Sequence, residues 1–122
     1  MENSAVILLG HGSRAEKANK VFASMVENLA GRLDYQHVAG AAMELTEPTL
    51  ETRVDEFVDY GIDSIIILPL FLFPGIHVQR DIPEMVEKLE NKYPEVEFKL
   101  GDIIGDDDRL TEILQDRLKG VN

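Results

Sequence analysis

Two of the three histidines in the sequence stand where a histidine can do chemistry. His11 lies between two glycines in GHGSR, directly after the apolar run AVILLG (5–10), and His77 lies in FPGIHVQRDIP, directly after DSIIILPLFLF (63–73). An imidazole in such a position can exchange a proton near neutral pH or bind a first-row metal ion. The third histidine, His37, precedes an apolar stretch, so we interpret it as structural or solvent-exposed.

A carboxylate follows a further apolar stretch, HVAGAAME (37–44), which ends at Glu44. Taken alone, Glu44 suits a helix cap or a salt bridge, because Pro48 marks a helix start nearby. Beside an imidazole it can instead bind a metal, accept a proton or orient the ring. Asn19, further along the first helical stretch, is expected on a helix surface.

Short apolar runs alternate with amphipathic stretches, which predicts four strand–helix units. The first helix is expected to begin near Arg14, with Ser13 and Glu16 as a capping box, and to stop at Gly31. The strands are predicted at 5–10, 37–44, 63–73 and 96–105, and the later helices at 46–61, from 81 onward and at about 107–119.

Four such units predict an α/β fold, a three-layer sandwich with a parallel sheet in the order 2-1-3-4. In sheets of this kind, ligands bind beyond the carboxyl ends of the strands, where the winding reverses between strands 1 and 3. His11 and His77 follow these two strands, which lie about 4.8 Å apart. Glu44 follows the strand on the other side of strand 1. The sequence therefore predicts that the two imidazoles can approach one site.

Composition narrows the class of protein. The 122 residues are interpreted as one domain (1–122), and 44% hydrophobic with 29% charged residues predicts a soluble globule. A net charge of −11 argues against binding to nucleic acid or an anionic membrane. The longest stretch without charged residues, 64–79, is too short for a membrane helix. No signal peptide is recognisable, and the absence of cysteine excludes disulfides, so a cytoplasmic location is expected.

The first turn allows a second interpretation, because residues 10–15 also match the dinucleotide motif G-x-G-x-x-A. The acidic residue that this motif requires at the end of the second strand is misplaced, since Asp34 precedes the strand and Glu44 lies too far along. A metal site agrees better with the residues, because two histidines with one carboxylate leave coordination positions open. A site with open coordination positions suits a metal ion that the protein binds weakly and then transfers to another molecule.

Four segments resemble one family in order along nearly the whole chain. They are GHGSR (10–14), MELTEPTL (43–50), PLFLFPGIHVQRDIP (69–83) and IGDDDR (104–109), and they resemble the sirohydrochlorin chelatases in their short class II form. The resemblance implies insertion of a divalent ion into sirohydrochlorin, a tetrapyrrole with eight carboxylates, without ATP or an organic cofactor. It also implies a homodimer with the active site between subunits, where longer relatives carry two such domains.

The resemblance assigns roles to individual residues. It implies that His11 and His77 bind the metal and that Glu44 removes protons or orients a histidine. An anionic substrate can bind to an acidic protein only where positive charge or hydrogen-bond donors lie close to its carboxylates. The candidates for this role are Gly12, Ser13, Arg14, Gly75 and Arg80. Co²⁺ is the expected metal, with Ni²⁺ or Fe²⁺ as alternatives. A non-catalytic metal or tetrapyrrole carrier, or a nucleotide-binding module, would be the competing classes.

Overall fold

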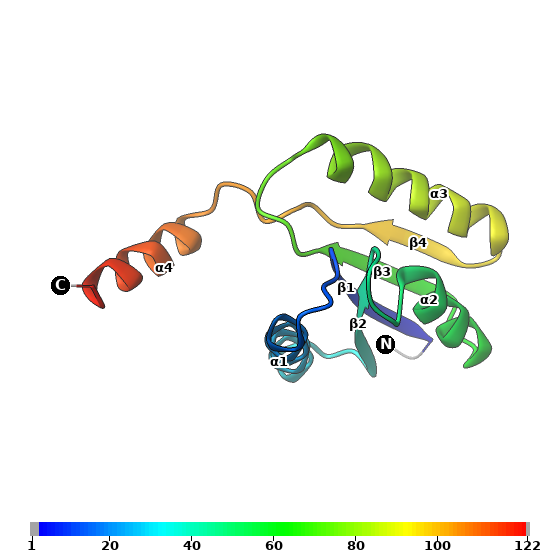
Figure 1. Ribbon diagram of the computed structural model, residues 1–122. Helices are drawn as coiled ribbons and strands as arrows, with labels where there is room; N and C mark the ends of the chain where they lie inside the picture. The colour runs from blue at the N-terminus through cyan, green and yellow to red at the C-terminus, as the bar shows by residue number, and fades with distance from the viewer. Residues whose placement is uncertain (1–2, 122) are drawn as a thin grey trace.

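The computed structural model describes residues 3–121, apart from the side chain of His77. Four parallel strands form one sheet in the order β2-β1-β3-β4, which confirms the predicted α/β architecture and strand order (Figure 1). The strands are β1 (Ser4–Gly10), β2 (His37–Ala42), β3 (Ser64–Pro69) and β4 (Glu97–Leu100). The helices are α1 (Glu16–Arg32), α2 (Leu50–Asp59), α3 (Ile82–Lys92) and α4 (Asp108–Lys119), with a π-helix, η1 (His77–Asp81), before α3.

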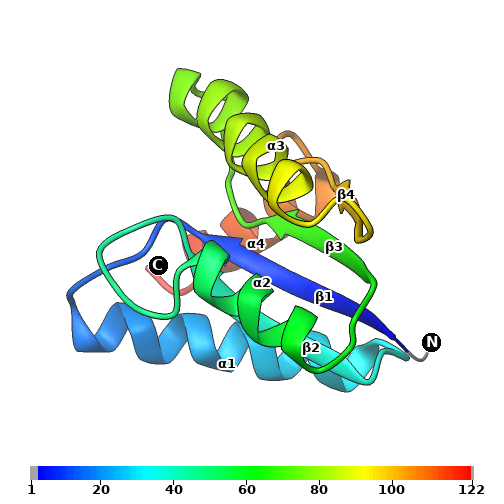
Figure 2. The same cartoon turned by 90° about the vertical axis from the view of Figure 1, so that its right-hand side faces the viewer.

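The hydrophobic core lies between the sheet and the helices α2 and α3, which Figure 2 shows in front of the strands. Alternate residues of a strand point to opposite faces, so one set from β1 and β3 faces these helices. The buried strand residues of this set are Ala5, Ile7, Leu9, Ile65 and Ile67, and they pack with Leu50, Val54, Phe57, Ile82, Val86 and Leu89. Burial of this apolar surface stabilises the central strands that carry the candidate site.

Helix α1 covers β2 on the opposite face of the sheet. The small residues of β2 allow this close approach, because a Cβ at Gly40 would lie 2.7 Å from Phe22 Cε2 and 2.9 Å from Val26 Cγ2. No residue of α1 is fully buried, so the predicted apolar face of this helix is only partly covered. The run of Ala and Gly in β2 is therefore explained by helix packing.

The start and end of α1 differ from the prediction. The helix begins at Glu16 with Ala15 at the N-cap position, and no side chain caps it. Ser13 Oγ accepts a hydrogen bond from the Ala15 N–H at 3.0 Å, so Ser13 closes a turn ahead of the helix and the predicted capping box is wrong. Gly31 does not stop the helix, which continues to Arg32.

Three predicted strands are too long, because apolar composition continues into the loops beyond them. β2 ends at Ala42, β3 at Pro69 and β4 at Leu100, whereas the sequence suggested residues 44, 73 and 105. Phe73 and Ile76, which follow β3, are 77% and 73% exposed. The third helix also starts differently: Asp81 does not cap it with its side chain but continues the helical turn that begins at His77.

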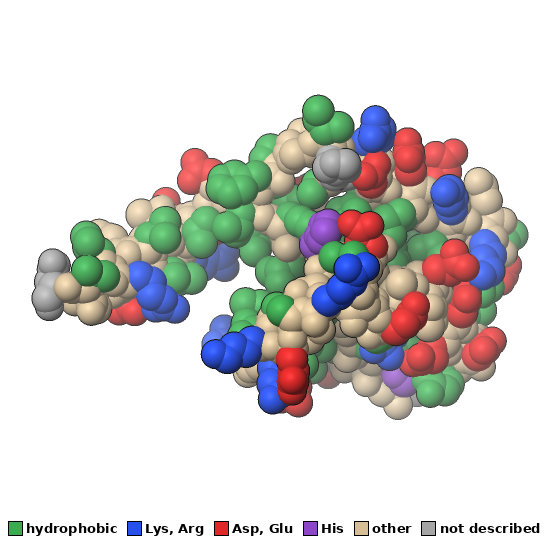
Figure 3. Space-filling view, in the orientation of Figure 1, with side chains coloured by type: hydrophobic (Ala, Val, Ile, Leu, Met, Phe, Trp, Pro, Cys, Tyr) green, Lys and Arg blue, Asp and Glu red, His purple; other side chains and the backbone are tan. Residues whose placement is uncertain are grey.

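Helix α4 occupies the predicted range but does not cover its own sheet. Asp107 caps it, because the carboxylate accepts the Arg109 N–H at 2.9 Å. Bonds from the Arg109 side chain hold the pKa of Asp107 at about 2. No residue of α4 is buried, and the helix extends away from the body on the side of α1 (Figures 1 and 3).

None of the helices within residues 3–121 has the length and apolar character needed to cross a bilayer.

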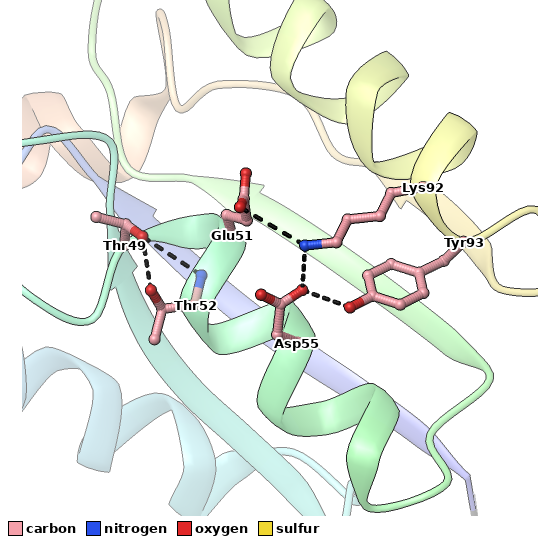
Figure 4. Close-up of polar contacts among 6 residues, drawn as sticks. All are labelled: Thr49, Glu51, Thr52, Asp55, Lys92 and Tyr93. Carbon is pink, nitrogen blue, oxygen red and sulfur yellow. Dashed lines mark hydrogen bonds and ion pairs between the residues drawn. The ribbon is translucent and has the colours of Figure 1, made fainter.

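A polar cluster joins α2 to the end of α3 (Figure 4). Tyr93 Oη donates to Asp55 Oδ1 at 2.5 Å, and Lys92 Nζ donates to the same oxygen at 3.0 Å. Lys92 also lies 3.6 Å from Glu51 Oε1. The Tyr93 hydroxyl, followed by Lys92, lowers the pKa of Asp55 below its usual value. The cluster therefore stabilises the contact of the two helices while Asp55 is ionised.

We expect Tyr93→Phe to lower the free energy of unfolding by about 1 kcal/mol at neutral pH, because Asp55 loses a donor. Since the folded-state pKa of Asp55 lies below 3.8, its contribution is present above that pH and is lost as the pH falls through the lowered pKa. Urea denaturation from neutral to acidic pH should show the gap between the two proteins narrowing in acid. Tyr60→Phe, at a 68% exposed tyrosine, is the control. Equal stability of wild type and Tyr93→Phe at neutral pH would contradict the account.

Candidate active site

His11 and Glu44 meet at the carboxyl edge of the sheet. His11 Nε2 lies 3.1 Å from Glu44 Oε1, and their side chains are 57% and 61% exposed. The pairing of β1 with β2 continues past the strand ends, because the Met43 N–H donates to Gly10 O at 2.9 Å and the Glu44 N–H to His11 O at 3.1 Å. The backbone of two neighbouring strands thus holds this imidazole and carboxylate together at the ends of β1 and β2, beside the predicted switch point between β1 and β3.

Gly12 is the residue that lets the two loops approach so closely. Its φ is +102°, and a Cβ at this position would lie 1.8 Å from the carbonyl oxygen of Glu44. The left-handed region of φ and the close backbone contact both require glycine. The space over this turn is filled by the backbone of Glu44, which disfavours the dinucleotide interpretation of GHGSRA.

Asn19 contributes to this loop in a way that the sequence did not indicate. Its Nδ2 donates to Ser13 O at 3.0 Å, so a helix residue ties down the turn that carries His11. Asn19 is half-buried and does not lie on the outer surface of the helix as expected. An asparagine one turn into an amphipathic helix gives no signal of such a contact, because the same residue type is common on solvated faces.

The loop after β3 brings the remaining candidates to the same edge of the sheet. The Gly75 N–H donates to Phe73 O at 2.9 Å, and the Gln79 N–H donates to Gly75 O at 2.9 Å. The backbone of His77 begins η1 directly after this turn, and its imidazole lies outside the described part of the structure. The structure therefore brings His11, Gly12 and Glu44 into contact, and the predicted approach of the second imidazole stays a prediction.

The two candidate arginines are exposed at this edge. Arg80 Nε lies 3.4 Å from Asp81 Oδ1, and the Arg80 side chain is 62% exposed. Arg14 follows Ser13 in the turn before α1 and is also exposed. Both can therefore reach an anion in solvent, and neither is buried in the protein.

An apolar surface lies beside the polar groups. Leu72, Phe73 and Ile76 are exposed in the loop between β3 and η1. Sequence analysis placed the first two in a strand, where they would be buried. Large apolar residues that stay exposed in one loop commonly mark a binding surface.

A cavity of about 680 Å³ begins at the turn of His11 and continues along β2 beneath α1. Gly12, Ser13, Asn19 and Phe22 are among the residues that line it. Its volume falls in the range of small-molecule sites, about 300–1,000 Å³.

The donor set at this edge is small. Within residues 3–121, setting aside the His77 imidazole, no cluster of three or more His, Cys, Asp or Glu side chains could hold a metal ion. The pair of His11 and Glu44 has the arrangement in which a carboxylate fixes the ring of a metal-binding histidine. One or two imidazoles with an open coordination sphere can bind a divalent ion and release it again.

This fold and site define an α/β domain with an imidazole–carboxylate pair at the carboxyl edge of a parallel sheet. The model of the CbiX family matches residues 5–121, and the chain belongs to that family.

Named relatives agree with this assignment. The chain is 32% identical to the sirohydrochlorin ferrochelatase of Bacillus subtilis, over 96% of this chain and 45% of the relative. It is also 32% identical to the sirohydrochlorin cobaltochelatase of Methanopyrus kandleri, over 94% of both chains. The crystal structure of the sirohydrochlorin chelatase SirB from Bacillus subtilis subspecies spizizenii in complex with cobalt superposes with a TM-score of 0.90 at 31% identity. That match covers 97% of this chain and 50% of the other. The chain thus spans about half the length of the Bacillus relatives.

Proposed function

We propose that this protein inserts a divalent metal ion into sirohydrochlorin without ATP or an organic cofactor. The observation that carries the proposal is the contact of His11 with Glu44 at the carboxyl edge of the sheet. It is supported by the similarity of the whole chain to proteins named sirohydrochlorin chelatases. The metal ion is a substrate of this reaction and binds only until it is transferred.

In this proposal, His11 and His77 hold the ion over the macrocycle. Glu44 Oε1 lies 3.1 Å from His11 Nε2, and the Gly12 carbonyl oxygen lies 3.4 Å from His11 Nδ1, so these two groups fix the orientation of the ring. The insertion of one divalent ion displaces two pyrrole N–H protons, and a neutral imidazole or the Glu44 carboxylate accepts them near neutral pH.

The substrate is bound by positive charge and apolar contact together. Arg14 and Arg80 pair with substrate carboxylates, helped by backbone N–H groups of Gly12, Ser13 and Gly75. These local donors offset the net charge of −11, which otherwise repels a polyanion. The exposed loop of Leu72, Phe73 and Ile76 supplies an apolar surface for the flat face of the macrocycle.

We propose Co²⁺ as the physiological metal, with Ni²⁺ and Fe²⁺ as alternatives. The named cobaltochelatase of Methanopyrus kandleri matches this chain over 94% of its own length, whereas the named ferrochelatase of Bacillus subtilis matches over 45%. A competition assay with purified protein, sirohydrochlorin and equal concentrations of the three ions should yield mainly the cobalt product, corrected for uncatalysed insertion. A predominance of the nickel or iron product would overturn the choice of metal and leave the chelatase activity standing.

We also propose that the protein acts in the cytoplasm as a homodimer of single domains, with the substrate between two subunits. The site on one chain is open and largely exposed, since His11 and Glu44 are both more than half accessible. A second subunit would exclude water from the macrocycle.

Glu44→Gln is expected to reduce the affinity for Co²⁺ and the insertion rate by about 10–100-fold each, because the amide polarises His11 less than the carboxylate does. Calorimetric titration with Co²⁺ and an absorbance assay of insertion measure the two effects. Glu51→Gln, at an exposed carboxylate of α2, is the matched control and should behave as wild type. A slower rate with unchanged Co²⁺ affinity would show that Glu44 acts as a base and does not orient His11.

A further inference from the structure

We infer that Asn19 is a positioning residue of the proposed active site. From helix α1 it holds the His11 turn (residues 11–14) in the place where His11 meets Glu44. The inference rests on the metal insertion proposed above and adds a residue that lies outside the proposed metal and substrate contacts. It starts from the hydrogen bond that Asn19 Nδ2 donates to Ser13 O at 3.0 Å.

The His11 turn has few hydrogen bonds to the rest of the protein. On the side of β2, the Glu44 N–H donates to His11 O at 3.1 Å. The Ser13 hydroxyl accepts the Ala15 N–H, which is a local bond. Of the hydrogen bonds that the turn makes beyond His11 in the described part of the chain, only that of Asn19 reaches a residue more than two positions away. Asn19 is therefore the link between the turn and α1.

The first turn of α1 places the Asn19 side chain for this contact. The Asn19 N–H donates to Ala15 O at 3.1 Å, which fixes its Cα in the helix. Side chains of a helix lean toward the helix N-terminus, so the amide points back to the turn that precedes α1. Ser13 O is a carbonyl oxygen and only accepts, so the amide must present its NH₂ group to it.

Helix α1 is a firm support for this bond, because Phe22 packs closely on two strands. A Cβ at Gly40 of β2 would lie 2.7 Å from Phe22 Cε2, and a Cβ at Gly10 of β1 would lie 3.0 Å from Phe22 Cε1. Figure 2 shows the segment that joins β1 to the start of α1. A path of direct contacts thus runs from the sheet through α1 and Asn19 to the turn that carries His11.

The residue type at position 19 is explained by this bond and not by the helix. Asparagine is a poorer helix former than alanine, which stands at the preceding position, Ala18. Asn19 is half-buried, whereas Ala18 and Lys20 beside it are exposed. A polar group removed from water in this way needs a hydrogen-bond partner, and Ser13 O supplies it.

Loss of the Asn19 bond should act on the groups that the His11 turn carries. The proposed reaction uses four of them: the His11 imidazole, the N–H groups of Gly12 and Ser13, and the Arg14 guanidinium. A displacement of about 1 Å at a reacting group can cost about 100-fold in rate. Because the Glu44 N–H still holds the His11 carbonyl, we expect a smaller effect of about 10-fold on metal affinity and on insertion.

Asn19→Ala and Asn28→Ala form a matched pair, because both remove an asparagine amide from α1 and Asn28 is exposed. Calorimetric titration with Co²⁺, without sirohydrochlorin, should give an affinity about 10-fold lower for Asn19→Ala and unchanged for Asn28→Ala. The melting temperatures of both variants should stay close to that of wild type, because alanine favours the helix. Asn19→Asp keeps the shape of the side chain but has no donor for a carbonyl, so it should also release the turn.

Magnetic resonance spectra test the positioning without metal or substrate. In ¹H–¹⁵N spectra of the imidazoles, the His11 signals of Asn19→Ala and Asn19→Asp should shift or broaden relative to wild type. The signals of His37, at the opposite end of β2, should not change. A loss of stability alone would affect both histidines.

The inference is overturned if either the His11 signals or the Co²⁺ affinity of Asn19→Ala equals that of wild type, or if Asn28→Ala loses as much. Wild-type His11 signals in Asn19→Asp would overturn it too, because shape and not the donor would then hold the turn. A higher KM for sirohydrochlorin at unchanged Co²⁺ affinity would show that Asn19 contacts the substrate. Failure of wild type to insert metal would remove the proposed function, whereas the His11 signals still decide whether Asn19 positions this histidine.

Discussion

Alanine in place of His11 or of His77 is expected to reduce metal insertion into sirohydrochlorin by at least about 100-fold. Loss of a residue that orients a metal ligand costs about 10–100-fold, and loss of the ligand itself should cost no less. The His11 side chain is 57% exposed, so its truncation leaves no cavity in the core and should change the melting temperature little. Absorbance assays of insertion and thermal unfolding measure the two effects separately.

His37→Ala is the control for both substitutions. His37 lies at the opposite end of β2, with its ring 5.8 Å from that of Phe57 and 6.3 Å from that of Tyr60. Its loss should lower stability modestly through these ring contacts and leave insertion unchanged. Wild-type turnover in His77→Ala would remove that histidine from the site, and a loss of activity in His37→Ala equal to that in His11→Ala would show that the assay reports folding.

Among substitutions of glycine by alanine in this chain, Gly12→Ala should cause the largest losses of stability and of insertion activity. With φ at +102° and the Glu44 carbonyl 1.8 Å from the added Cβ, the loops of β1 and β2 have to separate. We expect the free energy of unfolding to fall by roughly 2–4 kcal/mol. Insertion should be nearly abolished, because the same displacement pulls His11 away from Glu44. Urea denaturation and the insertion assay at a temperature where the variant is folded measure the two losses.

Gly31→Ala provides the comparison. No atom lies within 4 Å of a Cβ at this position in α1, so the methyl group meets open space. In a helix, alanine is favoured over glycine by about 1 kcal/mol. This variant should therefore be at least as stable as wild type and fully active. A Gly12→Ala protein with wild-type stability and activity would show that the loops relax without cost and would contradict the close contact described for the site.

The sheet was predictable because its signals are local and redundant. The continuous apolar runs around Ile7 and Ile67 are typical of strands buried on both faces, so they predict central strands, and the alternation of runs and amphipathic stretches predicts a parallel sheet. The placement of His11 and Glu44 at one edge followed from the same logic, since parallel strands end at a common edge, whereas their contact is a finding of the structure.

The errors occurred where tertiary contacts outweigh local pattern. Leu72 and Phe73 have strand composition, yet they lie exposed in a loop, because the sheet ends at Pro69. Ser13 has the spacing of a capping box, but its hydroxyl accepts the N–H of Ala15, before the helix starts. The role of Asn19 depends on where the turn lies relative to α1. The amphipathic pattern of α4 predicts the helix itself, but it does not predict that the helix has no buried residue in this chain.

The most direct test of the central claim is a multiple-turnover measurement of metal insertion. Purified protein is mixed with a large excess of sirohydrochlorin and Co²⁺, and the cobalt product is counted per chain against the uncatalysed reaction. A chelatase forms many product molecules per chain at a rate well above the uncatalysed one, and His11→Ala reduces this rate to near the uncatalysed level. Product formation that stops at one equivalent per chain, or proceeds at the uncatalysed rate, would identify a carrier and contradict the proposed activity.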